Sequence, residues 1–167
     1  MANIYSKFLD LIEKLEKFIL AVTVPVMIVV MVYQVILRYV FSSSNSWSEE
    51  LTRYLFIFNV MIAAAIAVRR NSHLQIDILI NLLSPKMKKI FTIAATLAGI
   101  VFLALLFKYS LDLCAQAKAN ISPGVGISMA IPYASMPIGI VLMILTSIEV
   151  VLHNLEALIS SKEVSGS

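Results

Sequence analysis

Charged side chains are scarce in this sequence of 167 residues, of which 14% are charged and 60% are hydrophobic. An average soluble domain has about 25% charged residues. About 20 consecutive apolar residues, each adding roughly 1.5 Å of helix, cross a hydrocarbon core of about 30 Å. Four long stretches contain no charged residue at all, namely 18–37, 54–68, 90–107 and 119–148. The sequence therefore predicts an all-α integral membrane protein with four transmembrane helices.

Charge is also missing from the middle of these stretches, where the polar residues are mild. They are Thr23, Gln34, Asn59, Thr92, Thr96, Ser135 and Thr146. Proteins that move ions or protons usually place an ionisable side chain inside the membrane. Its absence at mid-depth favours a membrane scaffold over a self-sufficient transporter. A small exporter acting as a homodimer is one alternative, with Glu50 at the outer rim as the nearest acidic candidate.

Signatures of catalysis and of cofactor binding are missing as well. The sequence has no glycine-rich phosphate loop, no cysteine cluster and no His/Glu motif with metal-ligand spacing. Cys114 is the only cysteine, so an intrachain disulfide is excluded. We therefore expect no enzyme activity, no metal and no cofactor. The main alternative is a redox anchor for haem or quinone, but both histidines, His73 and His153, lie outside the apolar stretches.

The lysines and arginines flank the apolar stretches unevenly. If both termini lie on the inner side of the membrane, nine of the 13 cations are inside and the other four are outside. The positive-inside rule therefore predicts cytoplasmic termini. The cations form no separate basic face, which argues against nucleic-acid binding. We expect contact with membrane lipid, with interfacial anchors at Lys14, Lys17, Arg38, Lys86, Lys88 and Lys89.

Residues 1–167 are expected to form one membrane domain. Two amphipathic helices are predicted at 3–17 and 72–84, the second with a polar stripe that includes His73 and Asp77. The first of them either lies in the headgroup plane or extends the first span into the cytoplasm. The stripe faces either the cytosol or a partner. The predicted spans are 18–38, 47–68, 87–108 and 131–152.

The start of the second span carries a cluster of polar residues. Ser46 and Glu49 have the spacing of a capping box, in which each side chain would satisfy a free backbone N–H of the helix start. Glu49 can also pair with Arg53 four residues on. Glu50 has no such role, so it is expected to face either solvent or a cation of a partner. Trp47 is either a headgroup-level anchor or part of a packed interface.

The fourth span is expected to begin near Pro132, where a proline in the first helical turn is tolerated. Pro137 and Gly139 would then kink this helix or allow a neighbouring backbone to approach closely.

Several motifs together resemble the small membrane subunit of tripartite ATP-independent periplasmic (TRAP) transporters, the DctQ type. Two of them are the run from Trp47 to Tyr54 (WSEELTRY) and the run from Ala67 to Asp77 (AVRRNSHLQID). The segments from Leu37 to Phe41 (LRYVF) and from 131 to 139 (IPYASMPIG) fit the same family in the same order.

The resemblance implies a subunit of a bacterial (Gram-negative) inner membrane, beside a much larger membrane subunit that carries the sodium and substrate sites. A periplasmic binding protein would deliver an organic acid, such as sialic acid or a C4-dicarboxylate, and uptake would be driven by sodium. The small subunit would brace the large one and help the binding protein to dock. This chain is expected to be a separate polypeptide, although some family members are fused to the large subunit. The residues expected at the interface between subunits are Trp47, Glu49, Glu50, Arg53, Arg69, His73, Asp77, Tyr133 and Pro137.

Overall fold

The computed structural model describes residues 2–43, 45–70 and 85–163. Four long helices dominate them, and all four are long and apolar enough to cross a membrane, which confirms the predicted fold class. Within the described part, the only β-structure is an isolated bridge between Ile121 and Ser128. The helices are α1 (Ala2–Tyr39), α2 (Ser46–Arg69), α4 (Pro85–Ala117), the short α5 (Ala130–Tyr133) and α6 (Ser135–Glu163).

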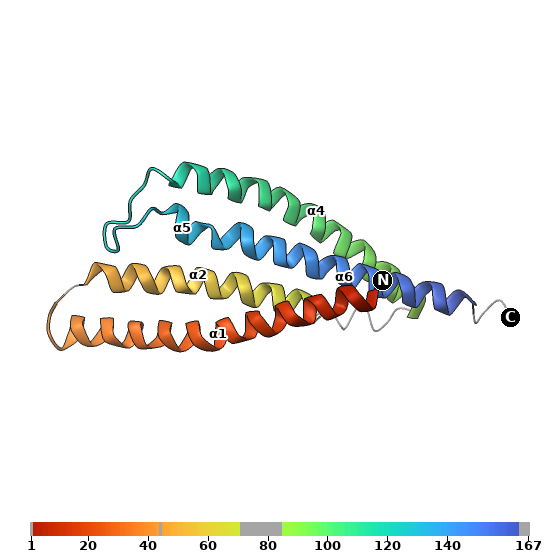
Figure 1. Ribbon diagram of the computed structural model, residues 1–167, viewed down its shortest axis with the longest axis horizontal. Helices are drawn as coiled ribbons and strands as arrows, with labels where there is room; N and C mark the ends of the chain where they lie inside the picture. The colour runs from red at the N-terminus through yellow and green to blue at the C-terminus, as the bar shows by residue number, and fades with distance from the viewer. Residues whose placement is uncertain (1, 44, 71–84, 164–167) are drawn as a thin grey trace.

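The helices pack side by side in an elongated bundle, with α1 against α2, α2 against α6, and α6 against α4 (Figure 1). The beginning of α1 and the end of α6 lie at one end, which we call the termini end. Residues 40–43 and 118–129, which follow α1 and α4, lie at the other end, the loop end. In the most apolar part of each helix, 22% of the residues of α2 and 39% of those of α6 are buried, but none of those of α1 and α4. Helices α2 and α6 are therefore central, and the apolar side chains of the flanking helices α1 and α4 are not buried by the rest of the bundle.

Helix α1 runs without interruption from Ala2 to Tyr39, so the predicted amphipathic segment 3–17 and the first span form one helix. Its first turns pack on the bundle. Leu9 is 1% exposed, and the Tyr5 hydroxyl donates a hydrogen bond of 2.7 Å to the carbonyl oxygen of Leu145 in α6.

The central contact joins α2 and α6 through a glycine. A Cβ atom placed on Gly139 would lie 2.7 Å from Cβ of Met61 and 3.2 Å from its carbonyl oxygen. Only a residue without a side chain allows this approach, as is common between membrane helices. A buried apolar cluster follows towards the termini end, including Ala65 and Met143.

A polar contact in the apolar region holds α1 against α2. The Thr23 hydroxyl donates a hydrogen bond to the side-chain oxygen of Asn59, which is 6% exposed. Thr23 Oγ1 also lies 2.8 Å from the carbonyl oxygen of Ile19 in its own helix. Thr23 and Asn59 thus join α1 and α2 through a hydrogen bond between two uncharged side chains.

One predicted helix start is wrong in its cap. Asn45 is the N-cap of α2 and no side chain caps it, so the capping box of Ser46 and Glu49 does not form. The fourth span begins near Pro132 as predicted, but as the short helix α5, and a break at Ala134 separates it from α6. Pro137, three residues later, explains the break, because proline has no N–H to donate to the preceding turn and its ring crowds that turn.

The predicted helix 72–84, with His73 and Asp77, lies outside the described residues. Lys86, Lys88 and Lys89 lie in the first two turns of α4. Lys14, Lys17 and Arg38 are exposed on α1, with Arg38 in its last turn.

Candidate functional site

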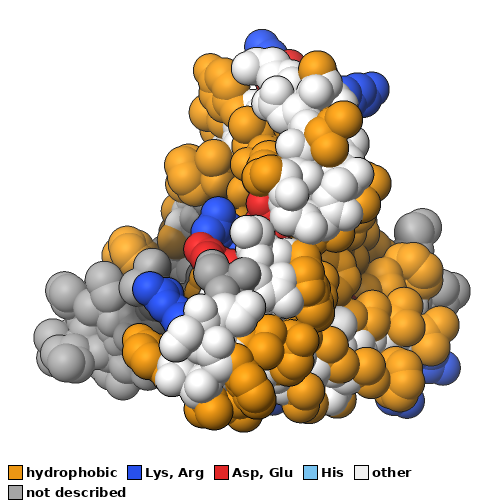
Figure 2. All heavy atoms as spheres, turned by 90° about the vertical axis from the view of Figure 1, so that its left-hand side faces the viewer, with side chains coloured by type: hydrophobic (Ala, Val, Ile, Leu, Met, Phe, Trp, Pro, Cys, Tyr) orange, Lys and Arg blue, Asp and Glu red, His pale blue; other side chains and the backbone are white. Residues whose placement is uncertain are grey.

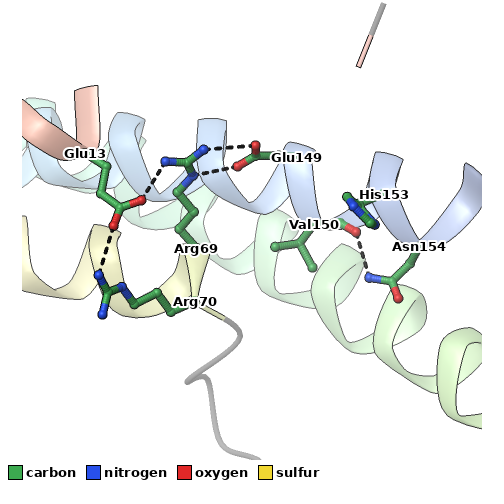
Figure 3. Close-up of a pocket in the computed structure, with 7 residues that line it drawn as sticks. All are labelled: Glu13, Arg69, Arg70, Glu149, Val150, His153 and Asn154. Carbon is green, nitrogen blue, oxygen red and sulfur yellow. Dashed lines mark hydrogen bonds and ion pairs between the residues drawn. The ribbon is translucent and has the colours of Figure 1, made fainter. Parts of the chain in front are cut away.

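Arg69, the last residue of α2, binds three carboxylates at the termini end, and Figure 3 shows two of them, Glu13 and Glu149. Its Nε and Nη2 lie 2.8 and 3.1 Å from the two oxygens of Glu149 on α6. Its Nη1 lies 2.6 Å from Glu13 and its Nη2 2.7 Å from Asp10, both on α1. One guanidinium group therefore joins α1, α2 and α6 with several charge-assisted hydrogen bonds.

Most of this contact is shielded from water. The side chain of Arg69 is 10% exposed, that of Glu13 15% and that of Glu149 16%, whereas that of Asp10 is 59% exposed. The bonds to Glu13 and Glu149 are therefore the energetically important ones, since exposed pairs contribute little. We call the ion-paired residues here the Arg69 cluster: Asp10, Glu13, Lys17, Arg69, Arg70 and Glu149.

A cleft of about 390 Å³ opens beside the cluster. Both of its carboxylates, Glu13 and Glu149, are already bonded to arginine. Across the described residues there is no group of three or more His, Cys, Asp or Glu side chains that could hold a metal. The arrangement is that of a junction between helices. The lining residues are Glu13, Arg69, Arg70, Glu149, Val150, His153 and Asn154.

Glu50 makes the corresponding contact at the loop end. Its Oε2 accepts hydrogen bonds from the backbone N–H groups of Gly124 and Val125, both at 3.2 Å, and from the hydroxyl of Ser122. A Cβ atom on Gly124 would lie 2.8 Å from the backbone of Ser46. The loop 118–129 is therefore held tightly against the start of α2. The carboxylate of Glu50 makes its contacts within this chain.

Apolar side chains are exposed on and beside this fixed loop. Ile121 is 70% exposed and Ile131 63%, and Val125 is also exposed. Figure 2, which looks onto the loop end, shows hydrophobic side chains around much of the visible periphery of the bundle. A rigid loop that presents apolar side chains is suited to contact another protein, because little entropy is lost on binding.

The remaining predicted interface residues of α2 lie at the surface of the loop end. Glu49 pairs with Arg53 at 3.0 Å as predicted, and both side chains are more than half exposed. Trp47 is 40% exposed and its ring centroid lies 6.0 Å from that of Tyr33 on α1. Each of these residues remains accessible to a neighbour.

The other predicted interface residues lie elsewhere. Tyr133 is half-buried at the end of α5 and Pro137 is buried in the first turn of α6. The structure does not bring the predicted set together, because Arg69 lies at the opposite end from Trp47 and Glu50. Contact of these residues with another subunit remains a prediction.

Sequence reasoning did not identify the residues that bind Arg69 and Glu50. Asp10 and Glu13 lie within the predicted amphipathic helix 3–17, and Glu149 directly follows the uncharged stretch 119–148. Pairing of Arg69 with Glu149 could have been suspected, since both follow directly after an uncharged stretch on the same predicted side of the membrane. No pattern marked Ser122 among the other small polar residues of its loop.

The family model of the DctQ component of tripartite ATP-independent periplasmic transporters matches residues 27–157. The chain is 30% identical over 138 residues to the sialic acid TRAP transporter permease protein SiaT of Haemophilus influenzae, covering 83% of this chain and 22% of that protein. It is 28% identical over 102 residues to the C4-dicarboxylate TRAP transporter small permease protein DctQ of Vibrio cholerae, covering 61% of this chain and 44% of that protein.

A further relative is similar over most of both chains. The sialic acid TRAP transporter small permease protein SiaQ of Vibrio cholerae is 24% identical over 149 residues, which are 89% of this chain and 86% of that protein. The family match extends from α1 through α6 and so includes Glu50, Arg69 and Glu149. The chain therefore belongs to the family of the DctQ component of tripartite ATP-independent periplasmic transporters.

Proposed function

We propose that this chain is the small, non-catalytic membrane subunit of a sodium-coupled TRAP transporter for an organic acid. In this role it lies in the inner membrane with both termini in the cytoplasm, braces a large transport subunit, and helps a periplasmic binding protein to dock. The family match is the observation that carries the proposal. The substrate classes are those named for its relatives, a sugar acid such as sialic acid or a C4-dicarboxylate.

The large subunit is supported by the length of some relatives. Aligned segments make up 22% of the permease SiaT and 21% of the isethionate TRAP transporter permease protein DctMQ of Oleidesulfovibrio alaskensis. In those proteins a homologous segment belongs to a chain several times longer. A companion of that size would find a large apolar surface on this bundle, because the apolar parts of α1 and α4 are unburied.

Bracing requires a bundle that keeps its shape, and both ends of this one are fixed by charge-assisted contacts. Arg69 joins three helices at one end and Glu50 holds the loop 118–129 at the other. Between Tyr54 and Val68, α2 has no charged residue. It therefore lacks the ionisable side chain that ion pathways usually place inside the membrane, which is consistent with a supporting role.

The loop end is the proposed docking surface for the binding protein. In the proposed orientation it faces the periplasm, and its exposed apolar side chains, Ile121 and Ile131, extend from a fixed backbone. Apolar groups at the centre of an interface commonly carry much of the binding energy between proteins.

The experiment first searches the neighbouring coding sequences for a large TRAP membrane subunit and a periplasmic binding protein, and then combines both with this chain. Purification of the tagged chain is expected to recover the large subunit, and proteoliposomes with all three are expected to take up the organic acid only under an inward sodium gradient. Uptake by this chain alone, or full uptake without it, would refute the proposal.

Docking is tested by Ile121→Ser combined with Ile131→Ser. The double variant is expected to slow uptake while recovery of the large subunit stays unchanged. Ala119→Ser, an exposed change in the same loop that removes little apolar surface, is the control. Equal uptake rates for both variants would exclude this docking surface.

A further inference from the structure

The Arg69 cluster is already neutral without any further group. Asp10, Glu13 and Glu149 supply three negative charges, and the three positive charges come from Lys17, Arg69 and Arg70. Each carboxylate is in an ion pair with at least one of these cations.

Glu16 is a fourth carboxyl group next to this neutral cluster. It lies three residues after Glu13 on α1, about one helical turn away. Its side chain is buried, with 4% of the residue exposed. Its Oε1 is inaccessible and has no hydrogen-bond partner among the residues that the structure describes.

An ionised carboxylate in this position would be unfavourable. Burial removes the water that stabilises its charge, and an unpartnered oxygen gains no hydrogen bond in return. Arg69 is close enough to attract it but is already bonded to three carboxylates, and the neighbouring Glu13 repels it. A neutral carboxylic acid avoids the cost of burying a charge and the repulsion by Glu13.

We propose that Glu16 binds a proton in the folded bundle, and that loss of this proton loosens the packing of α1 residues 5–17 against α2 and α6. The charges that act on Glu16 are Glu13 on α1 and Arg69 on α2. The other charged and titratable groups of the Arg69 cluster and its surroundings are Tyr5, Asp10 and Lys17 on α1, Arg70 on α2, and Glu149 and His153 on α6. The inference stands on the packing of this chain and does not depend on the proposed transport function.

The direction of the pH dependence follows from proton linkage. The unfolded chain releases the proton of Glu16 above about pH 4.3, while the folded chain keeps it to higher pH. The folded state therefore binds more protons over that range, and its stability falls as the pH rises.

The experiment measures the unfolding equilibrium of the full chain in detergent at about pH 6 and about pH 9. Histidine side chains in general titrate in this pH range, so all variants carry both His73→Gln and His153→Gln. With Glu16 present, the unfolding equilibrium constant is expected to rise at least about tenfold between the two pH values, which corresponds to a difference of one pKa unit. Glu16→Gln, which resembles the protonated side chain, is expected to abolish most of this rise. Glu49→Gln, at an exposed carboxylate, is expected to preserve it.

A spectroscopic measurement gives a second readout. The infrared spectrum at about pH 6 is expected to contain the stretching band of a protonated carboxyl group, which disappears in Glu16→Gln. If that variant does not fold, Glu16→Met replaces it in both measurements. The same pH dependence with and without Glu16, or a spectrum without this band, would overturn the proposal.

Discussion

Replacing Arg69 by glutamine tests the junction between α1, α2 and α6 directly. Glutamine keeps much of the length of the side chain but removes the positive charge and the two guanidinium N–H donors, on Nε and Nη2, that bind Glu149. Glu13 and Glu149 would then remain as partly buried carboxylates with one cationic partner fewer each. The loss of stability measured for the variant therefore includes the cost of leaving charges unpaired as well as the loss of the contact.

The expected loss of stability can be worked out from burial. Removing one partner of a buried ion pair costs about 3–5 kcal/mol. The bond to Asp10 adds under about 1 kcal/mol, because an ion pair with an exposed partner is weak. Since Glu13 and Glu149 keep some exposure, we expect a total near the lower limit, about 3 kcal/mol.

The assay is unfolding of the purified chain in mixed micelles, followed by loss of helical circular dichroism. The neighbouring Arg70→Gln is the matched control, because Arg70 is 59% exposed and its single ion pair, to Glu13, is 3.3 Å long. We expect the control to lose under about 1 kcal/mol. Equal losses for the two variants would refute the view that burial makes the Arg69 contacts strong.

Two further predictions concern the loop end and the central helix contact. Glu50→Ala removes the acceptor of two backbone hydrogen bonds, so amide hydrogen exchange at Gly124 and Val125 is expected to become faster while the α2–α6 core stays protected. The control Glu49→Ala should leave the exchange of both amides unchanged. Unaltered exchange in Glu50→Ala would count against the contact. Gly139→Leu is expected to destabilise the bundle by about 1–3 kcal/mol, since its side chain would overlap Met61. Gly99→Leu, at a site with no atom within 4 Å of an added Cβ, should change stability by under about 0.5 kcal/mol, and equal losses at the two glycines would contradict the close packing.

The helices were predictable because the signals for them are local. A stretch such as 18–37 without charge requires a helix in a membrane, since every backbone hydrogen bond must be made within the segment. The pairing of Glu49 with Arg53 was predictable for the same reason, because residues four apart on a helix are neighbours. The capping box was predicted from equally local spacing but does not form, because Asn45 and not Ser46 is the N-cap, which places Glu49 one residue too far into the helix.

The contacts of Arg69 and Glu50 could not be predicted in this way. Arg69 and Glu149 are 80 residues apart in the sequence, and Glu50 and Ser122 are 72 apart. No periodicity connects such positions, and flanking arginines are expected beside any membrane span. Their pairing became visible only with the relative placement of the helices.

The sequence by itself determined that this chain forms apolar helices able to cross a membrane, because hydrophobicity and helix length are properties of single segments. Only the tertiary structure decided which helices lie at the centre, which carboxylates neutralise Arg69, and that Glu16 is buried without a partner. The physical reason is that burial and ion pairing depend on which side chains meet in space, and in this bundle those side chains come from helices far apart in the chain.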